Sequence, residues 1–224
     1  MKNIINHKLQ ILNWLGKNYN IKTSIDFGGI WNVDGFYTKH MHETYSLNKS
    51  TIVDRFWPSD LKEKLDLIGI ECADCLFSDF DFENKSYDVC ILFDVLLHQV
   101  IPDWRNFLGR ISKHCEFIVI YNPQWLRRTS CRLTDLDDRQ YFMEIPHEPC
   151  EDPYNYYTNN RQGKCSYAGV QIKDSFRLWQ WGITNLDLIN AMHNYGFQLI
   201  YLKNYFGWTQ LKNFQNYGFI FKHV

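Results

Sequence analysis

Ser24-Ile-Asp26-Phe27-Gly28-Gly29 is the most informative part of this chain for its fold. It is a short β-prone run with an acid near its end, followed at once by two glycines that lead toward a helix. Glycines take positive φ and let the backbone approach a ligand closely, so a strand that ends in such a turn is a typical ligand-binding start of an α/β domain. The turn is not the G-x-G-x-x-G fingerprint of dinucleotide-binding proteins.

Three further acids close predicted strands in the same half of the chain. They are Asp54 at the end of residues 50–54, Asp74 just after residues 67–72, and Asp94 at the end of residues 87–94. The last of these runs is almost wholly apolar, as a parallel strand buried on both faces should be. Open α/β sheets bind ligands at the carboxyl ends of their strands. We therefore expect these acids and Asp26 to lie at one ligand-binding edge.

Strands alternate with helix-length segments as far as residue 121. Apolar residues at steps of three and four predict a helix over residues 3–15 that stops near Gly16, Pro102 opens another helix, and residues 116–121 form a fifth strand. This order of elements predicts an α/β fold: a three-layer Rossmann-like sheet of about seven strands, mostly parallel.

The regular pattern is lost from residue 122 to residue 182, a segment rich in aromatic residues, Pro, Asn and Arg. A structureless loop of this length is uncommon unless it is functional, so we expect a partly folded cap inserted after strand five. Thr184 then caps a helix that Gly196 ends. The connection between the strands 197–202 and 217–221 is short for a crossover helix, which predicts an antiparallel last strand.

The chain of 224 residues is expected to form one domain. Its parts are residues 1–121 (cofactor-binding half), 122–182 (substrate cap) and 183–224 (closing helix and strand pair). The 24 basic and 25 acidic side chains nearly balance, which argues against nucleic acid or a membrane as partner. Seven scattered cysteines and no leader-like N-terminus indicate a cytoplasmic protein with reduced thiols. The sequence leaves the oligomeric state open.

The glycine turn resembles motif I of class I S-adenosylmethionine-dependent methyltransferases, although Ile30 and Asn32 replace two glycines of that motif. In that family the first acid interacts with the cationic amino-acid part of the cofactor. The next two acids meet the ribose hydroxyls and the adenine amino group, and Asp-Val-Leu-Leu-His-Gln over 94–99 resembles the element after the fourth strand. The resemblance implies that S-adenosyl-L-methionine is the cofactor, bound by Asp26, Gly28, Gly29, Asp54, Asp74, Cys75 and Asp94.

Methyl transfer to a hydroxyl needs a base as well as alignment of the acceptor. His98, close after Asp94, is the first candidate for this base, and His147 in the cap is the second. Aromatic walls with converging polar groups would suit a small polar substrate. The candidate substrate residues are Gln124, Trp125, Arg132, Tyr141, Trp179 and Trp181. No metal site is expected, although Asp135, Asp137 and Asp138 could hold a divalent cation.

Residues 179–188 resemble a bacterial subgroup of these enzymes, some of which tailor surface sugars in capsule or polysaccharide biosynthesis. The resemblance therefore implies methyl transfer to a small polar acceptor, an oxygen of a sugar, nucleotide-linked or phosphorylated metabolite. Two alternatives stay open. The chain could be a non-catalytic cofactor-binding or partner subunit, or an NAD-dependent oxidoreductase with an unusual glycine turn.

Overall fold

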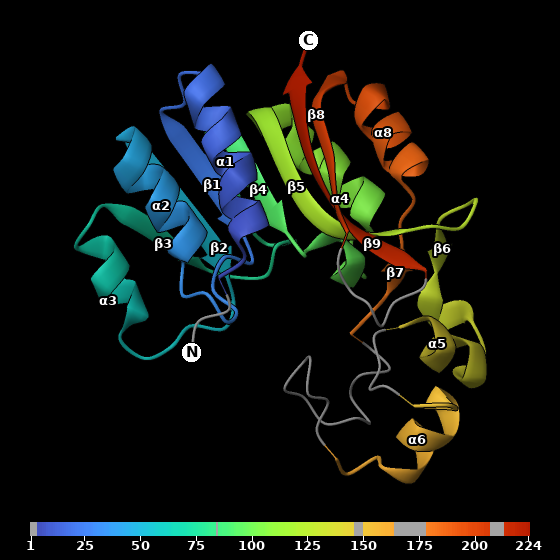
Figure 1. Cartoon of the computed structure of the whole chain (residues 1–224). Helices are drawn as coiled ribbons and strands as arrows, with labels where there is room; N and C mark the ends of the chain where they lie inside the picture. The colour runs from blue at the N-terminus through green and yellow to red at the C-terminus, as the bar shows by residue number, and fades with distance from the viewer. Residues whose placement is uncertain (1–3, 84, 146–149, 164–177, 207–212) are drawn as a thin grey trace.

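The computed structural model describes residues 4–83, 85–145, 150–163, 178–206 and 213–224. Its centre is a seven-stranded sheet in the order β3-β2-β1-β4-β5-β9-β8 (Figure 1). The strands are β1 (Thr23–Phe27), β2 (Lys49–Asp54), β3 (Ile70–Asp74), β4 (Tyr87–Phe93), β5 (Cys115–Trp125), β8 (Phe197–Phe206) and β9 (Phe214–His223). Strands β1 to β5 are parallel, whereas β9 runs antiparallel between β5 and β8. The predicted sheet with an antiparallel last strand is confirmed.

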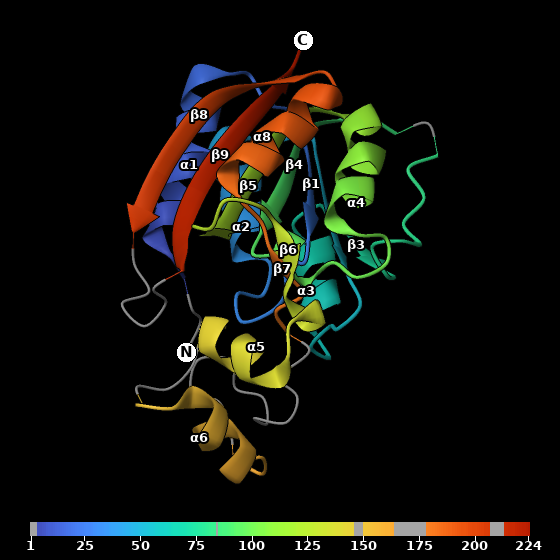
Figure 2. The same cartoon turned by 90° about the vertical axis from the view of Figure 1, so that its right-hand side faces the viewer.

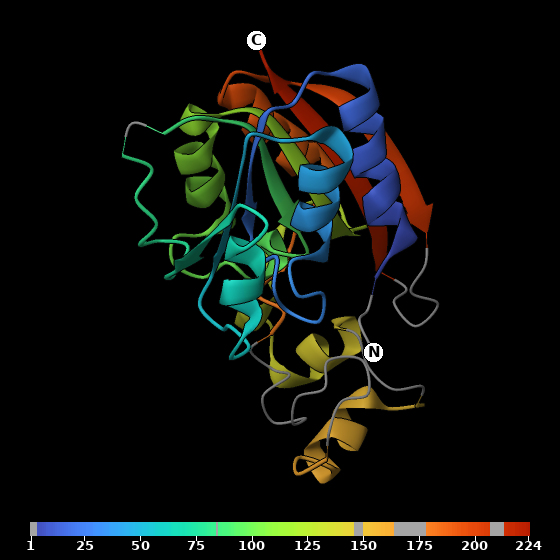
Figure 3. The same ribbon diagram turned by 90° about the vertical axis from the view of Figure 1, so that its left-hand side faces the viewer.

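Helices cover both faces of the sheet, which gives the three layers (Figures 1 and 2). On one face lie α1 (Asn6–Asn18) and α2 (Phe36–Tyr45), and on the other lie α4 (Trp104–Ile111) and α8 (Asn185–Asn194). The short α3 (Leu61–Asp66) packs beside β3 (Figure 3). Strand β5 shows why two cores form: Phe117 and Val119 pack under α1, and the alternating Ile118 and Ile120 pack under α4 and α8.

Two predicted element boundaries were wrong, and in both cases a glycine has another role than the one expected. Helix α1 continues through Gly16, where a Cβ atom would lie 2.4 Å from the Tyr45 ring, so this glycine serves close helix packing and not a stop. Strand β3 begins only at Ile70. The preceding Leu67 caps α3, and Gly69 takes φ +81° between helix and strand.

Two other boundaries were displaced along the chain. Helix α4 begins at Trp104 with Asp103 as its N-cap, whose carboxylate accepts from the backbone N–H of Asn106, so Pro102 precedes the helix. Strand β5 does not end at Tyr121 but continues to Trp125, because β9 pairs with it along this whole length. The segment outside the sheet therefore starts after Trp125.

Beyond the carboxyl edge of the sheet lie α5 (Asp138–Glu144) and α6 (Pro153–Asn159), and the short strands β6 (Cys131–Arg132) and β7 (Trp181–Gly182) pair with each other (Figures 1 and 2). These elements share an apolar cluster with the ends of the main sheet. Its members include Leu97, Trp125, Leu133, Tyr141, Tyr157, Trp179 and Phe214. That the segment works as a substrate cap stays a prediction. Among the described helices, none is long and apolar enough to cross a membrane.

The start of α8 follows the sequence expectation. The hydroxyl oxygen of Thr184 accepts from the backbone N–H of Asp187 at 3.1 Å, and Gly196 takes φ +82° just beyond the helix. Ser130 also donates its hydroxyl to Thr184, which ties the cap segment to this helix start.

We expect Thr184→Ala to lower the free energy of unfolding by about 1 kcal/mol, because an N-cap hydroxyl is lost. Thr184→Ser keeps the hydroxyl and is the matched control. Urea unfolding of the three proteins measures the difference. An alanine variant as stable as the serine variant would contradict this account of the helix start.

Candidate functional site

Four carboxylates meet at the carboxyl edge of the sheet. Asp26 is the second-last residue of β1, Asp54 and Asp74 are the last residues of β2 and β3, and Asp94 directly follows β4. Since β3, β2, β1 and β4 are neighbours in this order, the acids stand side by side, and Asp54 is opposite Asp74 in register. The structure thus brings together the acids that the strand pattern predicted. Their functional roles stay predictions.

The Asp26 carboxylate is buried and folds over the glycine turn. It accepts a hydrogen bond from the Thr38 hydroxyl of α2 at 2.6 Å. A Cβ atom on Gly29 would lie 2.5 Å from this carboxylate, and Gly28 has φ +80°, so both positions need glycine. Burial raises the pKa of Asp26 to about 7; the Thr38 hydrogen bond and Lys8 oppose the rise, and Asp54 adds to it.

The departures from the glycine motif do not prevent the turn. Asn32 takes φ 60°, the left-handed conformation that asparagine tolerates better than most residues. Ile30 has a buried side chain that packs with Ile52, and its backbone N–H donates to Asp54 at 3.3 Å. The loop therefore reaches α2 with its backbone held against the second acid.

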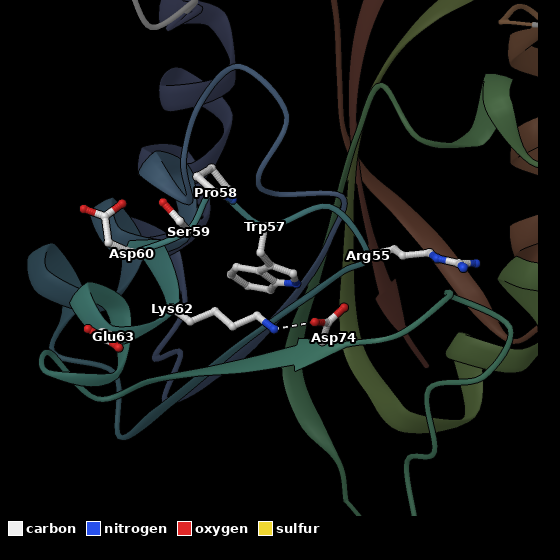
Figure 4. A pocket seen from close by; sticks show the side chains of 8 residues that line it. All are labelled: Arg55, Trp57, Pro58, Ser59, Asp60, Lys62, Glu63 and Asp74. Carbon is white, nitrogen blue, oxygen red and sulfur yellow. Dashed lines mark hydrogen bonds and ion pairs between the residues drawn. The ribbon is translucent and has the colours of Figure 1, made fainter.

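Asp54 organises the loop that follows β2. Its carboxylate accepts from the backbone N–H of Arg55 at 2.7 Å, and its carbonyl oxygen accepts from the Trp57 indole at 2.8 Å. Next to it, residues of this loop and of α3 surround a hollow of about 430 Å³ (Figure 4). Asp74 lies at its rim and is ion-paired with Lys62, whose ammonium lies 5.3 Å from the centre of the Trp57 ring.

Cys75 follows Asp74, and its backbone N–H donates to the carbonyl oxygen of Asp54 at 3.2 Å. Burial raises the pKa of the Cys75 thiol, so it stays protonated at neutral pH. This environment does not favour nucleophilic or redox chemistry, and Cys75 contributes to the edge through its backbone.

Asp94 has φ +57° and forms an ion pair with Lys8 of α1, 2.6 Å from Nζ to Oδ2. The lysine is buried, and its ammonium lies 5.4 Å from the ring centre of each of Tyr37, Phe93 and Tyr121. We call these three rings together with Asp94 the aromatic cage. It stands beside Asp26, close enough for Lys8 to lower the pKa of that acid.

His98 lies in a 3₁₀ turn after β4, where the cap segment reaches it. Its ring Nδ1 is hydrogen-bonded to the carbonyl oxygen of Leu178, and its ring lies 6.4 Å from that of Trp179. A carbonyl oxygen only accepts, so Nδ1 carries the proton and Nε2 keeps its lone pair. Loss of water around the imidazole lowers the pKa of His98, which leaves the ring neutral at pH 7 although the residue reaches solvent.

The same loop binds two further groups of the cap segment. The Gln180 N–H donates to the Leu97 carbonyl oxygen at 3.0 Å, and the Trp181 indole donates to that of Gln99 at 2.7 Å. The structure thus unites His98, Trp179 and Trp181, which the sequence placed far apart. His147 lies outside the described residues.

The other predicted substrate residues have different surroundings. Gln124 is fully buried on β5, and neither atom of its amide has a hydrogen-bond partner. Trp125 packs on Phe214, with ring centres 4.8 Å apart. Tyr141 is fully buried and donates to the Trp179 carbonyl oxygen, and Arg132 is exposed on β6. Among these predicted substrate residues, as far as the structure describes them, Gln124 is the one with a buried amide that has no hydrogen-bond partner.

Of the three acids Asp135, Asp137 and Asp138 in the cap segment, Asp137 has a structural role. Asp137 is the N-cap of α5, and its carboxylate accepts from the backbone N–H of Gln140. Within the described ranges, no group of three or more His, Cys, Asp or Glu side chains is arranged so that it could hold a metal ion.

Lys8, Tyr37 and Tyr121 were not among the site residues predicted from the sequence. A signal for Lys8 was present, because its position three residues after Ile5 and four before Leu12 puts it on the apolar face of α1. A lysine on such a face needs a partner, and Asp94 provides it. The hollow beside Trp57 carried no comparable signal.

The fold is that of the class I, Rossmann-like methyltransferases. No family model matches the sequence, and no curated protein matches it. The structure is similar to 1,6-didemethyltoxoflavin-N1-methyltransferase of Burkholderia thailandensis, solved with 1,6-didemethyltoxoflavin and S-adenosylhomocysteine (TM-score 0.62, 11% identity, 97% of this chain and 78% of that one).

Two other solved structures show the same likeness. N-methyltransferase NodS of Bradyrhizobium japonicum, in complex with S-adenosylhomocysteine, has TM-score 0.57 and 10% identity over 97% of this chain and 86% of that one. An O-methyltransferase family protein of B. thailandensis has TM-score 0.58 and 13% identity, and the match covers 98% of this chain and 56% of that one. At such identities the likeness shows the fold.

The raised pKa of Asp26 gives the first prediction at this site. A group whose pKa is higher in the folded chain stabilises the fold while it is protonated, and this contribution is lost as pH rises from 3.8 to about 7. We expect Asp26→Asn, which cannot titrate, to remove a slope of up to ~1.4 kcal/mol per pH unit from the unfolding free energy in that window. Urea unfolding at several pH values measures it. A constant difference between variant and wild type from pH 4 to 7 would refute the assignment.

Proposed function

We propose that this protein transfers a methyl group from S-adenosyl-L-methionine to a small polar acceptor. The observation that carries the proposal is the row of four carboxylates beside the glycine turn, at the edge where open α/β sheets bind ligands. The cofactor has a sulfonium, an ammonium, a ribose diol and an adenine amino group. Carboxylates suit all four as hydrogen-bond acceptors or counter-charges. S-adenosylhomocysteine is present in two of the structural neighbours, which supports this choice of ligand.

Each acid has a part that fits its surroundings. Asp26, beside the open backbone of Gly28 and Gly29, would pair with the ammonium of the cofactor, which favours its ionised form. Asp54 keeps free lone pairs besides those used by backbone N–H groups, so it can accept from the ribose hydroxyls. The hollow at Trp57 and Asp74 would take the adenine, with the Lys62 ammonium moving off Asp74.

On the acceptor side, methyl transfer is an in-line displacement at the sulfonium methyl carbon. Bound S-adenosyl-L-methionine would supply this methyl group and would leave as S-adenosylhomocysteine, and an acceptor hydroxyl would have to give its proton to a base. His98 is the candidate base, because its lone pair at Nε2 is free and its imidazole is neutral at pH 7. Its place between Asp94 and the cap would let it face both cofactor and acceptor. His147 stays the second candidate.

The acceptor is proposed to be a small molecule with an oxygen nucleophile, bound between the carboxyl edge and the cap segment. The buried Gln124 amide, with its donor and acceptor both unused, would recognise a neighbouring polar group of such a molecule. A sugar or other metabolite of surface-glycan tailoring fits this description. That association rests on the sequence resemblance of residues 179–188.

The cofactor claim gives a binding experiment. We expect isothermal titration to show binding of S-adenosylhomocysteine and none of NAD. Asp54→Asn should weaken S-adenosylhomocysteine binding by about 1.5–3 kcal/mol, the range for losing hydrogen bonds to a charged group. Asp66→Asn, an acid on α3 away from the strand ends, is the control. Binding of NAD in preference to S-adenosylhomocysteine would support the oxidoreductase alternative, and binding without turnover on a metabolite panel would support the non-catalytic one.

The base claim gives a kinetic experiment. With an acceptor from the panel, we expect the rate to rise with pH and then to level off, with the midpoint of the rise below 6.5, since loss of water around the imidazole lowers the pKa of His98. His98→Ala should lower kcat by about 10²–10⁴-fold and leave S-adenosylhomocysteine binding unchanged. His98→Gln should not restore the rate, because an amide cannot take the proton. Near-normal turnover in the glutamine variant would reduce His98 to a positioning role.

A further inference from the structure

The aromatic cage around Lys8 has the geometry of a cation-binding site. Three rings from three elements, Tyr37 of α2, Phe93 of β4 and Tyr121 of β5, surround one ammonium at the same distance of 5.4 Å. Each is within the range at which a cation is attracted by the face of an aromatic ring. The carboxylate of Asp94 completes the cage at 2.6 Å from the ammonium. These four partners favour a cation over a neutral or an anionic group.

The backbone shows that the carboxylate is held in place for this contact. Asp94 takes φ +57°, a strained conformation for a residue other than glycine, directly at the end of β4. Its backbone N–H donates to the Tyr121 carbonyl oxygen at 2.8 Å. This hydrogen bond joins the backbones of the acid and of one ring of the cage. The Lys8 side chain is 8% exposed, whereas that of Asp94 is 36% exposed. The cage is therefore closed around the lysine and open on the side of the acid.

The segment that carries Lys8 is attached to the rim of the cage. The backbone N–H of Ile5 donates to the Tyr37 hydroxyl at 2.7 Å, and the His7 ring stacks on Tyr205 at 4.5 Å. Tyr205 in turn lies against Tyr121. Burying a lysine costs free energy unless its charge is compensated, and here one carboxylate and three rings compensate it.

We propose that the aromatic cage is a cation subsite of the reaction centre and that Lys8 is its resident cation, a specificity-determining residue. With the cage filled and Asp94 neutralised, no ammonium group of an acceptor can use it. The lysine charge, added to that of a sulfonium cofactor, instead favours an acceptor oxygen that carries or develops negative charge. This statement about acceptors rests on the proposed methyl transfer, whereas the cage itself does not.

The test replaces Lys8 by alanine and adds, as a free ligand, the part of the lysine side chain that the substitution removes. Lys8→Ala keeps Cβ, so n-propylammonium replaces the rest of the side chain and n-propanol is its uncharged counterpart. Without any cofactor, we expect n-propylammonium to bind the alanine variant at least about tenfold more tightly than wild type, the size of effect that a desolvated cation–π site and an ion pair can supply. n-Propanol should bind neither protein, and Asp94→Asn in the Lys8→Ala background should abolish the gain.

Lys62→Ala is the matched control, because Lys62 also pairs with an acid but lies near a single ring and has a side chain that is 36% exposed. It should not gain affinity for n-propylammonium. Equal binding by the Lys8→Ala and Lys62→Ala variants, or binding of n-propanol as tight as that of n-propylammonium, would overturn the proposal. Because no cofactor is used, failure here is distinct from failure of S-adenosylhomocysteine to bind.

A second measurement leaves Lys8 in place, should its removal prevent folding. Under reductive methylation with formaldehyde, followed by mass spectrometry, we expect Lys8 to react at least about tenfold more slowly than Lys62. Asp94→Asn should raise the Lys8 rate toward that of Lys62, because the cage then lacks its counter-charge. A Lys8 that reacts as fast as Lys62 in wild type, or as slowly in the asparagine variant as in wild type, would contradict a cation-specific cage.

Discussion

The burial of one carboxylate, Asp26, is the constraint on which the carboxyl edge depends. It sits near the end of the central strand β1, folds over Gly29 and accepts from Thr38 in the first turns of α2. A side chain on Gly29 would displace it, and loss of the Thr38 hydroxyl would leave it without its neutral partner. The glycine turn, the start of α2 and the first acid therefore form a single unit. This unit also fixes the loop at Ile30, whose backbone N–H donates to the Asp54 carboxylate. The second acid is therefore held against the same loop.

The two acids at the ends of this row are paired with lysines, whereas the two in the middle are not. Asp26 and Asp54 face the glycine turn with mostly backbone and hydroxyl partners. Asp74 and Asp94 are each neutralised by a lysine, Lys62 at the exposed end and Lys8 at the buried end. A cationic cofactor would thus meet unpaired acids in the middle of the row, while the aromatic cage is already filled. This arrangement links the proposed cofactor to the proposed preference for oxygen acceptors.

Much of the fold could be predicted from the sequence because its signals are local. The apolar run of β4, the acids after strands and the Thr184 cap each act within a few residues. The end of β5 could not be predicted, because Asn122 and Pro123 are poor strand formers that pairing with β9 keeps extended. The aromatic cage was missed for a similar reason. It unites residues from α1, α2, β4 and β5, and only the tertiary structure brings them to one ammonium.

A crystal structure of the protein with S-adenosylhomocysteine tests the central claim most directly. We expect the ribose hydroxyls to donate to Asp54, the amino group of the homocysteine part to lie at Asp26, and the adenine to occupy the hollow beside Trp57 and Asp74, with Lys8 still in its cage. A ligand bound away from the carboxyl ends of β1 and β2, or one whose ribose does not contact Asp54, would contradict it.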